Sequence, residues 1–290
     1  MKVMRTISFE SVASAVSELC IEAAYELPED VTAAVRRAIE TESIPRAAEI
    51  LKQLLENARI AAERRIPICQ DTGITVIFIT LGKDISIQPP EDNPDATIID
   101  AVQQGVSRGY ETGLLRKSVV SEPLQHRKNT QTNTPAVVHL EIVTGDALHL
   151  TVMLKGGGCE NKSQFRMFNP TESKENVSNW IVEVIRNAGA NACPPFVVGV
   201  GLGGDFESCC LLSKKALIRE IGTSHRDPYY ARMEKELMKA ANSGGPGPQG
   251  LGGDTTVLAV HIETAPCHIA SLPAAVNIEC HAHRHKSVVL

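Results

Sequence analysis

The stretch Ile68-Cys69-Gln70-Asp71-Thr72-Gly73 constrains the fold of this chain most strongly. It follows Pro67 and precedes the β-branched run Ile74–Leu81, so a turn separates the preceding sequence from a buried strand. A thiol, an amide, a carboxylate and a hydroxyl occupy four consecutive positions of this turn. A simple turn or a core segment does not need that composition, whereas a loop that holds a polar ligand does. The sequence therefore predicts a functional loop around Cys69.

Composition excludes several classes of protein. The chain has 290 residues, of which 43% are hydrophobic and 22% charged, as in soluble globular proteins. A net charge of −5 favours neither nucleic acid nor an anionic membrane as a partner. No apolar run reaches the roughly 18 residues of a membrane span, and Met1–Glu10 has no signal-peptide core. We expect a cytoplasmic protein without nucleic-acid or membrane partners.

The hydrophobic pattern changes at the Cys69 loop. Before it, helical spacing of apolar residues predicts three helices, at Phe9–Glu26, Glu29–Glu42 and Pro45–Arg65. After it, Thr144-Gly145-Asp146 predicts a hairpin that joins two strands. Strands are predicted at Ile74–Leu81, Pro135–Val143, Ala147–Leu154, Phe196–Val200, Thr255–Glu263 and Ala274–Ile278, and further helices at Asp95–Gly113, Thr171–Ala188, Phe206–Ile221 and Asp227–Ala241. The expected fold is mixed α/β, with a helical N-terminal third followed by strands with flanking helices, in a single compact catalytic domain over residues 1–290.

Eight cysteines divide into two groups. Cys20, Cys209 and Cys210 lie in helix-like sequence and are expected to be buried apolar residues. The other cysteines include residues 69, 159, 193 and 280, which lie beside Gly, Pro or His in loop-like sequence. No CxxC pair occurs, which argues against a zinc ribbon or a ferredoxin-type cluster. Three loop thiolates that converge through the fold can hold an iron–sulfur cluster and leave one iron open as a Lewis acid.

Two other patterns indicate ligand binding. Lys155-Gly156-Gly157-Gly158 follows a predicted strand, and adjacent glycines let backbone N–H groups approach an anion. The loop Glu122–Thr134 is longer than most connections between secondary-structure elements, and loops of this length often have a function. Gly199–Gly204 fits the letters of GxGxxG, which makes a nucleotide-binding regulatory module an alternative, although a polar turn stands where a second strand ending in an acid is required.

The C-terminal histidines leave a third reading open. Cys280, His281, His283 and His285 could form a zinc-binding structural site, because alternating histidines favour metal binding. A solvated tail is the structural alternative for the same residues.

Five ordered motifs resemble those of one enzyme family. The motifs are Ile68–Gly73, Lys155–Gly158, Cys193-Pro194-Pro195, Gly247–Gly253 and Asn277–Lys286. They are similar to motifs of the α-subunit, or N-terminal domain, of class I fumarate hydratases and their L-tartrate dehydratase relatives, from about residue 9 to the C-terminus. The resemblance implies a hydro-lyase of the tricarboxylic acid cycle that converts fumarate to (S)-malate.

The resemblance also implies roles for individual residues. The family's cluster ligands correspond to Cys69, Cys193 and Cys280, which would hold a [4Fe–4S] cluster. Its open iron would bind the carboxylate and hydroxyl of a small dicarboxylate. The substrate-binding positions correspond to Gln70, Asp71, Arg116, Gly157 and His268. Of these, Asp71 and His268 are the expected catalytic residues, because both can handle protons.

Two departures from the family pattern affect the substrate and the assembly. Cys159 is more typical of tartrate-type sequences and would be a spare thiol near the cluster, whereas Lys155, Glu160-Asn161 and the final histidine run favour fumarate. L-tartrate dehydratase remains the alternative. Because the chain ends ten residues after Cys280, we expect a β-subunit that carries the C-terminal fumarase domain. The expected assembly is an αβ hetero-oligomer, with a dimer of αβ pairs as one arrangement.

Overall fold

The computed structural model describes residues 4–290 and divides the chain into two compact units. Unit 1 contains Met1–Pro28, Ala58–Gly156 and Arg284–Leu290, and unit 2 contains Glu29–Asn57 and Gly157–His283. Each unit has its own four-stranded sheet and its own apolar core. The predicted mixed α/β class is therefore confirmed. That residues 1–290 act as one catalytic domain stays a prediction.

The three N-terminal helices form where their periodicity predicts them. They are α1 (Phe9–Tyr25), α2 (Glu29–Thr41) and α3 (Pro45–Arg64). The Ser8 hydroxyl accepts a hydrogen bond from the Ser11 N–H at 3.1 Å and so caps the start of α1. The helices are distributed over both units, because α1 belongs to unit 1, α2 to unit 2, and α3 is divided between them.

The sheet of unit 1 has the strand order β10-β5-β2-β4. Its strands are β2 (Ile74–Gly82), β4 (Val137–Val143), β5 (Leu148–Lys155) and β10 (His285–Val289). The predicted hairpin between β4 and β5 is wrong, because β2 lies between them, parallel to β4 and antiparallel to β5. Of β2, β4 and β5, β2 is the most apolar, and its position between the other two covers both of its edges.

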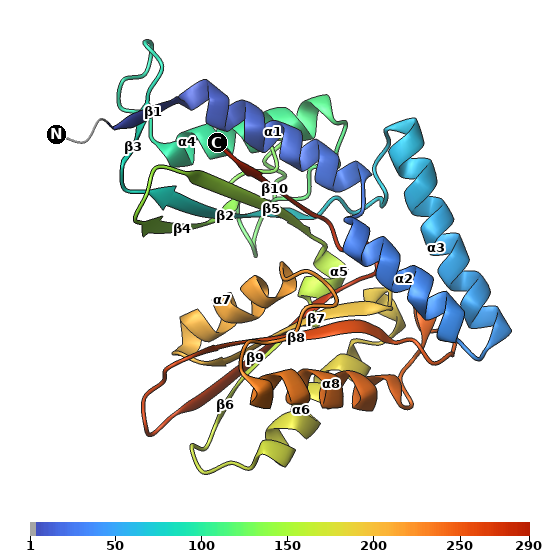
Figure 1. The fold of residues 1–290 in the computed structure, drawn as a ribbon. Helices are drawn as coiled ribbons and strands as arrows, with labels where there is room; N and C mark the ends of the chain where they lie inside the picture. Colours follow the sequence, from blue (N-terminus) through green and yellow to red (C-terminus); the bar gives the residue numbers. More distant parts are fainter. Residues whose placement is uncertain (1–3) are drawn as a thin grey trace. The chain divides into compact units, whose positions relative to one another are not determined.

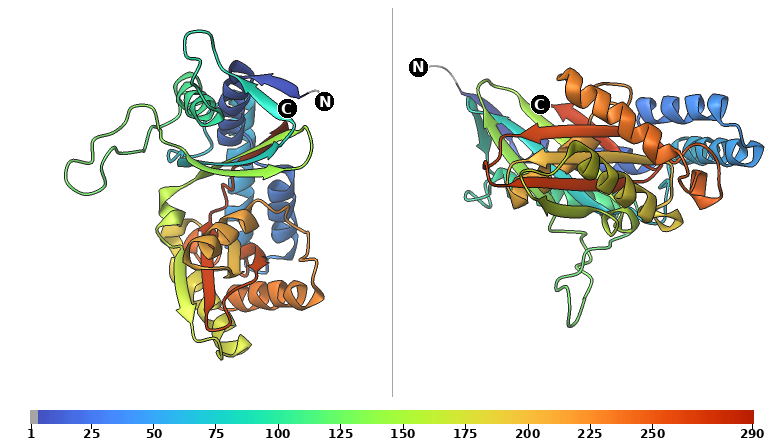
Figure 2. Two further views of the ribbon diagram at one scale, coloured as in Figure 1. Left: turned by 90° about the vertical axis from the view of Figure 1, so that its left-hand side faces the viewer. Right: turned by 90° about the horizontal axis from the view of Figure 1, so that it is seen from below.

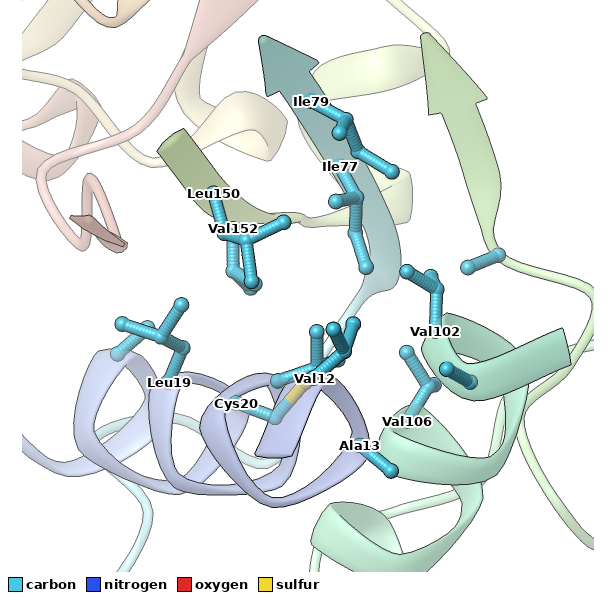
Figure 3. Close-up of a cluster of buried hydrophobic side chains, with 14 of the residues drawn as sticks. Val12, Ala13, Leu19, Cys20, Ile77, Ile79, Val102, Val106, Leu150 and Val152 are labelled. Atoms are coloured by element: carbon cyan, nitrogen blue, oxygen red, sulfur yellow. The ribbon is translucent and has the colours of Figure 1, made fainter. Parts of the chain in front are cut away.

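One face of this sheet is covered by α1 and by α4 (Ile98–Thr112). Figure 3 shows Val12 and Leu19 of α1, Val102 and Val106 of α4, and Ile77 of β2 meeting in the core. Cys20 belongs to the same core and is fully buried, as the sequence predicted. Two short strands that the sequence did not reveal, β1 (Arg5–Ser8) and β3 (Ile85–Gln88), pair in parallel beside this layer.

The sheet of unit 2 has the strand order β6-β9-β7-β8. Its strands are β6 (Gln164–Phe168), β7 (Phe196–Gly203), β8 (Val257–Ala265) and β9 (Leu272–Glu279). Helices α6 (Lys174–Ala188) and α8 (Pro228–Asn242) cover one face, and α7 (Phe206–Leu217) covers the other (Figure 1). Short helical turns are α5 (Gly157–Glu160), η1 (Ala190–Ala192) and η2 (Pro248–Gly250).

The long polar segment between α4 and β4 is a loop, as predicted. Figure 2 shows this green segment extending away from the rest of unit 1. Its ordered feature is an antiparallel bridge between Val120 and Asn129.

The C-terminal histidine run is not a solvated tail. His283 and Arg284 are 0% and 1% exposed, and the following residues form β10, which pairs with β5. β10 was not predicted because it is only five residues long and begins with the polar residues His285, Lys286 and Ser287. Its pairing partner β5 also lies far away in the sequence. Within residues 4–290, none of the helices combines the length and apolar character needed to cross a lipid bilayer.

Candidate active site

The Cys69 loop of unit 1 connects α3 to β2 and is fixed by hydrogen bonds to its main chain. Gly73 has φ +72°, and a Cβ atom there would come within 2.6 Å of the Lys155 carbonyl, so glycine is required. The Tyr110 hydroxyl donates to the Thr72 carbonyl at 2.8 Å, and the Asn133 amide donates to the Gly73 carbonyl at 3.2 Å. Tyr110 and Asn133 are themselves buried, which makes the loop a rigid platform.

Burial also fixes the protonation state of this support. Desolvation is the main cause that raises the pKa of Tyr110, with the nearby Cys20 thiol adding to the effect. Tyr110 therefore remains a hydroxyl donor at neutral pH. Burial raises the pKa of Cys20 to about 12, so this thiol stays protonated as well.

Asp71 lies at the centre of the platform. Its Oδ1 atom accepts a hydrogen bond from the Gly73 N–H at 2.9 Å, and its main-chain carbonyl accepts one from Arg284 Nη1 at 2.6 Å. The Thr72 hydroxyl donates to the Arg116 carbonyl at 2.7 Å, which ties the Arg116 segment to the same loop. Two predicted substrate-binding residues, Asp71 and Arg116, therefore belong to one hydrogen-bonded structure.

The two residues before Asp71 contact each other. The Cys69 thiol donates to the Gln70 side-chain carbonyl at 3.3 Å. Gln70 is exposed, and Cys69 is half-buried. This places a thiol and an amide on the accessible side of the loop.

In unit 2, three buried side chains form a group with the chemistry of a metal site. One ligand atom from each of Cys159, Glu279 and Cys280 lies within 4.8 Å of the other two. Cys159 belongs to α5, Glu279 ends β9, and Cys280 follows it. Glu279 was not identified from sequence, and its position directly before a cysteine at a strand end is the signal that could have revealed it.

Strand pairing brings Cys193 to the same end of the sheet. β7 runs antiparallel to β9 with Val197 opposite Glu279, so the segment before β7 meets the segment after β9. The His281 N–H donates to the Cys193 carbonyl at 3.4 Å. The Cys159 thiol donates to the carbonyl of Ala192, one position before Cys193, at 3.5 Å.

These residues fit an iron–sulfur cofactor. Thiolates are the usual ligands of such clusters, and this end of the sheet offers the buried thiols of Cys159 and Cys280 with the main chain of Cys193 beside them. The segments of two predicted ligands, Cys193 and Cys280, meet here, and the Cys159 thiol lies close to that of Cys280. That Cys193 and Cys280 are ligands and Cys159 a spare thiol stays a prediction. Cys69 belongs to unit 1, so its place in the ligand set stays a prediction.

A comparison with protein families assigns the chain. Residues 13–289 match the model of the family described as fumarate hydratase (Fumerase). The chain belongs to the fumarate hydratase family. Members of this family are hydro-lyases, and the resemblance found in the sequence motifs is confirmed.

Curated relatives of this fumarate hydratase family member cover nearly the whole chain. A protein of Methanocaldococcus jannaschii, provisionally named L(+)-tartrate dehydratase subunit alpha, is 40% identical over 277 residues, which are 94% of this chain and 95% of the relative. The L(+)-tartrate dehydratase subunit alpha of Escherichia coli O157:H7 is 30% identical over 91% of this chain and 86% of its own length. That of Escherichia coli strain UTI89 is 31% identical over 89% and 84%.

His268 does not lie with the thiols in this family member. It is exposed in the loop between β8 and β9, where its ring Nδ1 accepts the Ala270 N–H at 3.1 Å. That loop is at the start of β9, whereas Cys280 follows the end of β9. Eight residues of strand at about 3.3 Å each separate the two ends by more than 20 Å. The catalytic role of His268 stays a prediction, and it must account for the distance between His268 and Cys280 within one chain.

Gly157, the remaining predicted substrate-binding residue, begins α5 and is exposed. Its carbonyl accepts the Asn161 N–H at 3.0 Å, which closes the short helical turn. The turn places Cys159 on the buried side, so the glycine run and the thiol group belong to one local structure.

The glycine pattern at residues 199–204 serves packing rather than phosphate binding. Gly199 and Gly201 lie inside β7, and Cβ atoms there would come within 2.0 Å of the Ser213 carbonyl and 2.1 Å of the Cys209 carbonyl. Only glycine lets α7 lie so close to this strand. A dinucleotide fingerprint needs its glycines in the turn after the strand. Because Gly199 and Gly201 lie within the strand, the motif does not support the nucleotide-binding alternative.

The histidine-based zinc site also lacks support. Within residues 4–290, the metal-binding group consists of Cys159, Glu279 and Cys280 and includes no histidine. The ring Nε2 of His283 lies 2.8 Å from the Leu217 carbonyl, which gives this residue a structural contact in unit 2.

Proposed function

We propose that this protein is the α-subunit of an iron–sulfur hydro-lyase that interconverts fumarate and (S)-malate. The observation that supports it best is the convergence of thiol-bearing segments at one end of the unit 2 sheet, where Cys159, Glu279 and Cys280 come within 4.8 Å. In this proposal Cys69, Cys193 and Cys280 hold a [4Fe–4S] cluster. When bound, the cluster supplies an open iron that polarises the carboxylate and hydroxyl of the substrate.

The chain's own residues bind the substrate and move protons. Arg116 pairs with a substrate carboxylate, and Gln70 and the backbone N–H of Gly157 provide neutral hydrogen-bond donors. Asp71, held by the Gly73 N–H, transfers a proton to or from the substrate. The rigid attachment of its loop to Tyr110 and Arg284 keeps the carboxylate in one position.

His268 can reach the same substrate as Cys280 only from another copy of the chain, because β9 separates the two residues within one copy. A dimer of αβ pairs provides such a second copy. The proposed assembly therefore has a β-subunit that completes each site with further substrate-binding residues, and two α-subunits that exchange His268.

L(+)-tartrate is the second candidate substrate. The three relatives described above carry the name of L(+)-tartrate dehydratase subunit alpha. Cys159 was the sequence feature in favour of tartrate, and it lies within the thiol group.

The test is an anaerobic assay of the chain with and without the product of the neighbouring gene. Iron and sulfide are quantified first, and malate dehydration and tartrate dehydration are then measured on the same preparation. The proposal predicts about four irons and four sulfides per chain, with faster turnover of malate than of tartrate in the presence of the partner. A protein without iron and sulfide after reconstitution would overturn the proposal, and full activity of the isolated chain would overturn the subunit assignment.

A further inference from the structure

Arg284 is a buried cation to which the reaction described above assigns only the support of the Asp71 loop. Its side chain is 1% exposed, although it directly precedes the edge strand β10. One of its hydrogen bonds is from Nη1 to the Asp71 carbonyl at 2.6 Å. In the part of the chain that the structure describes, its Nε atom has no hydrogen-bond partner. Burying a guanidinium with an unmatched donor is costly, so a ligand is expected to satisfy it.

The open edge of Arg284 has the geometry of a carboxylate site. Nη1 binds the Asp71 carbonyl, and the edge formed by Nε, which has no partner among the described residues, and Nη2 takes no part in that bond. These two nitrogens form one of the parallel forks with which arginine binds a carboxylate in bidentate fashion.

Room for at least one added carbon atom lies next to this edge, at Gly156. Although Gly156 is buried, a Cβ atom placed there would have two heavy-atom neighbours within 4 Å outside its own chain neighbours. They are Asp71 Oδ2 at 3.5 Å and Arg284 Nη2 at 3.6 Å. A cationic group and a proton-accepting carboxylate therefore line one small space in unit 1, which the absence of a side chain at residue 156 keeps open.

We propose that Arg284 binds one carboxylate of the substrate through Nε and Nη2 in the space beside Gly156, next to Asp71. This inference rests on the proposed function and adds a specificity-determining residue to it. The matching ligand is a hydroxydicarboxylate in which the carboxylate and the proton to be transferred are on adjacent carbons. Its carboxylate pairs with Arg284, and its transferable proton faces Asp71 Oδ2.

Two substitutions on opposite sides of the space test the proposal in the assembled αβ enzyme. Arg284→Lys keeps the charge and removes the fork. Gly156→Ala fills the space at ordinary van der Waals distances, so the fold is expected to tolerate it. Arg108→Lys is the matched control, because Arg108 is a surface residue paired with Glu10. Cluster content and circular dichroism are checked for every variant.

The measurements are kcat, KM for malate, and the Kd of succinate, a dicarboxylate that cannot react, by isothermal titration calorimetry. We expect Arg284→Lys and Gly156→Ala each to raise the KM and the Kd of succinate about tenfold or more, as loss of a bidentate pair implies, whereas Arg108→Lys changes neither. We also expect guanidinium ion at millimolar concentration to restore succinate binding in Arg284→Ala.

Unchanged KM and succinate Kd in both Arg284→Lys and Gly156→Ala would overturn the inference. A loss that appears only in Arg284→Ala, without rescue by guanidinium and with normal behaviour of Gly156→Ala, would assign Arg284 a structural role and overturn it as well. A wild-type enzyme that acts on no hydroxydicarboxylate would instead refute the proposed function, which keeps the two failures distinct.

Discussion

The two units of the chain contribute different chemistry from similar scaffolds. Each has a four-stranded mixed sheet covered by helices. Unit 1 holds hydrogen-bonding and charged groups, with the Asp71 loop attached to Tyr110 and Arg284. Unit 2 holds sulfur, with Cys159 and Cys280 gathered at one end of its sheet. Apart from Cys69 in unit 1 and Gly157 and His268 in unit 2, the proposed substrate contacts and the thiols lie in separate parts of the fold. Substitutions at the other proposed residues of one unit should therefore leave the function of the other unit intact.

The largest effect is expected from the thiols of unit 2. Cys193→Ser and Cys280→Ser should each reduce iron and sulfide to background and abolish activity, because a cluster ligand is lost. Cys159→Ser should retain the cluster, since Cys159 is the spare thiol of the proposed set. Metal and sulfide analysis after anaerobic reconstitution checks this, with Cys210→Ser as a control in α7. Loss of the cluster in Cys159→Ser with retention in Cys193→Ser would replace the predicted ligand set.

Asp71→Asn in unit 1 should strongly reduce turnover without loss of the cluster. The amide cannot accept a proton, so kcat should fall by about 10²- to 10⁴-fold. Because Asp71 is not one of the proposed thiol ligands, the iron and sulfide content should stay at the wild-type level. Steady-state kinetics combined with metal analysis tests the separation of functions, and a loss of cluster in this variant would break it.

His268 allows a test of whether two copies share one site. His268→Ala alone should lower kcat by about 10²-fold. Mixed with inactive Cys280→Ser, it should recover about one quarter of wild-type activity, because random exchange makes half of the dimers mixed and leaves each mixed dimer one intact site. The activity of refolded mixtures is compared with that of each variant alone. The absence of recovery would show that His268 does not act across copies.

The smallest effect concerns acid stability and again separates the units. Burial, followed by the charge of Arg219, lowers the pKa of His261 from 6.5 to about 4, while Glu234 and Asp30 oppose the shift. The unfolded chain therefore binds a proton that folded unit 2 excludes, and stability falls as the pH drops below 6.5. Between pH 6.5 and 5 the loss is about 2 kcal/mol.

Amide hydrogen exchange measures this loss in each unit. The amides of β7 and β8 in unit 2 should lose protection over this pH range, and those of β2 and β5 in unit 1 should not. In unit 1 the buried Cys20 and Tyr110 have raised pKa values and stay neutral throughout. His261→Gln should remove the pH dependence in unit 2, and a dependence that persists in this variant would contradict the assignment to His261.

Local patterns predicted the helices and strands well where the hydrophobic pattern extends over many residues. The apolar spacing over residues 45–65 gave α3, and the β-branched run after Gly73 gave β2. The pattern failed where partners are distant in sequence. β4 and β5 are adjacent along the chain, but β2 lies between them, and β10 pairs with β5 from the far end of the chain. Strand order depends on which surfaces need burial, and a local window does not contain that information.

The candidate site shows the same division. Cys69, Asp71, Cys193 and Cys280 could be proposed from the sequence because thiols and carboxylates beside Gly and Pro are unusual residues with few structural uses. Glu279 and Arg284 could not, because a charged residue near a strand end is common, and only the burial of these two marks them. That His268 and Cys280 lie at opposite ends of β9 could likewise be seen only once the bounds of this strand were known.

The amino-acid sequence by itself determined the membership of the fumarate hydratase family, and it supplied the thiols and the carboxylate on which the proposed chemistry depends. The tertiary structure decided which of these groups meet. Antiparallel pairing of β7 with β9 joins Cys193 to Cys280, and the return of the chain into β10 brings Arg284 to Asp71. The physical reason is that side-chain chemistry is a property of each residue, whereas proximity follows from strand pairing and burial across the whole chain.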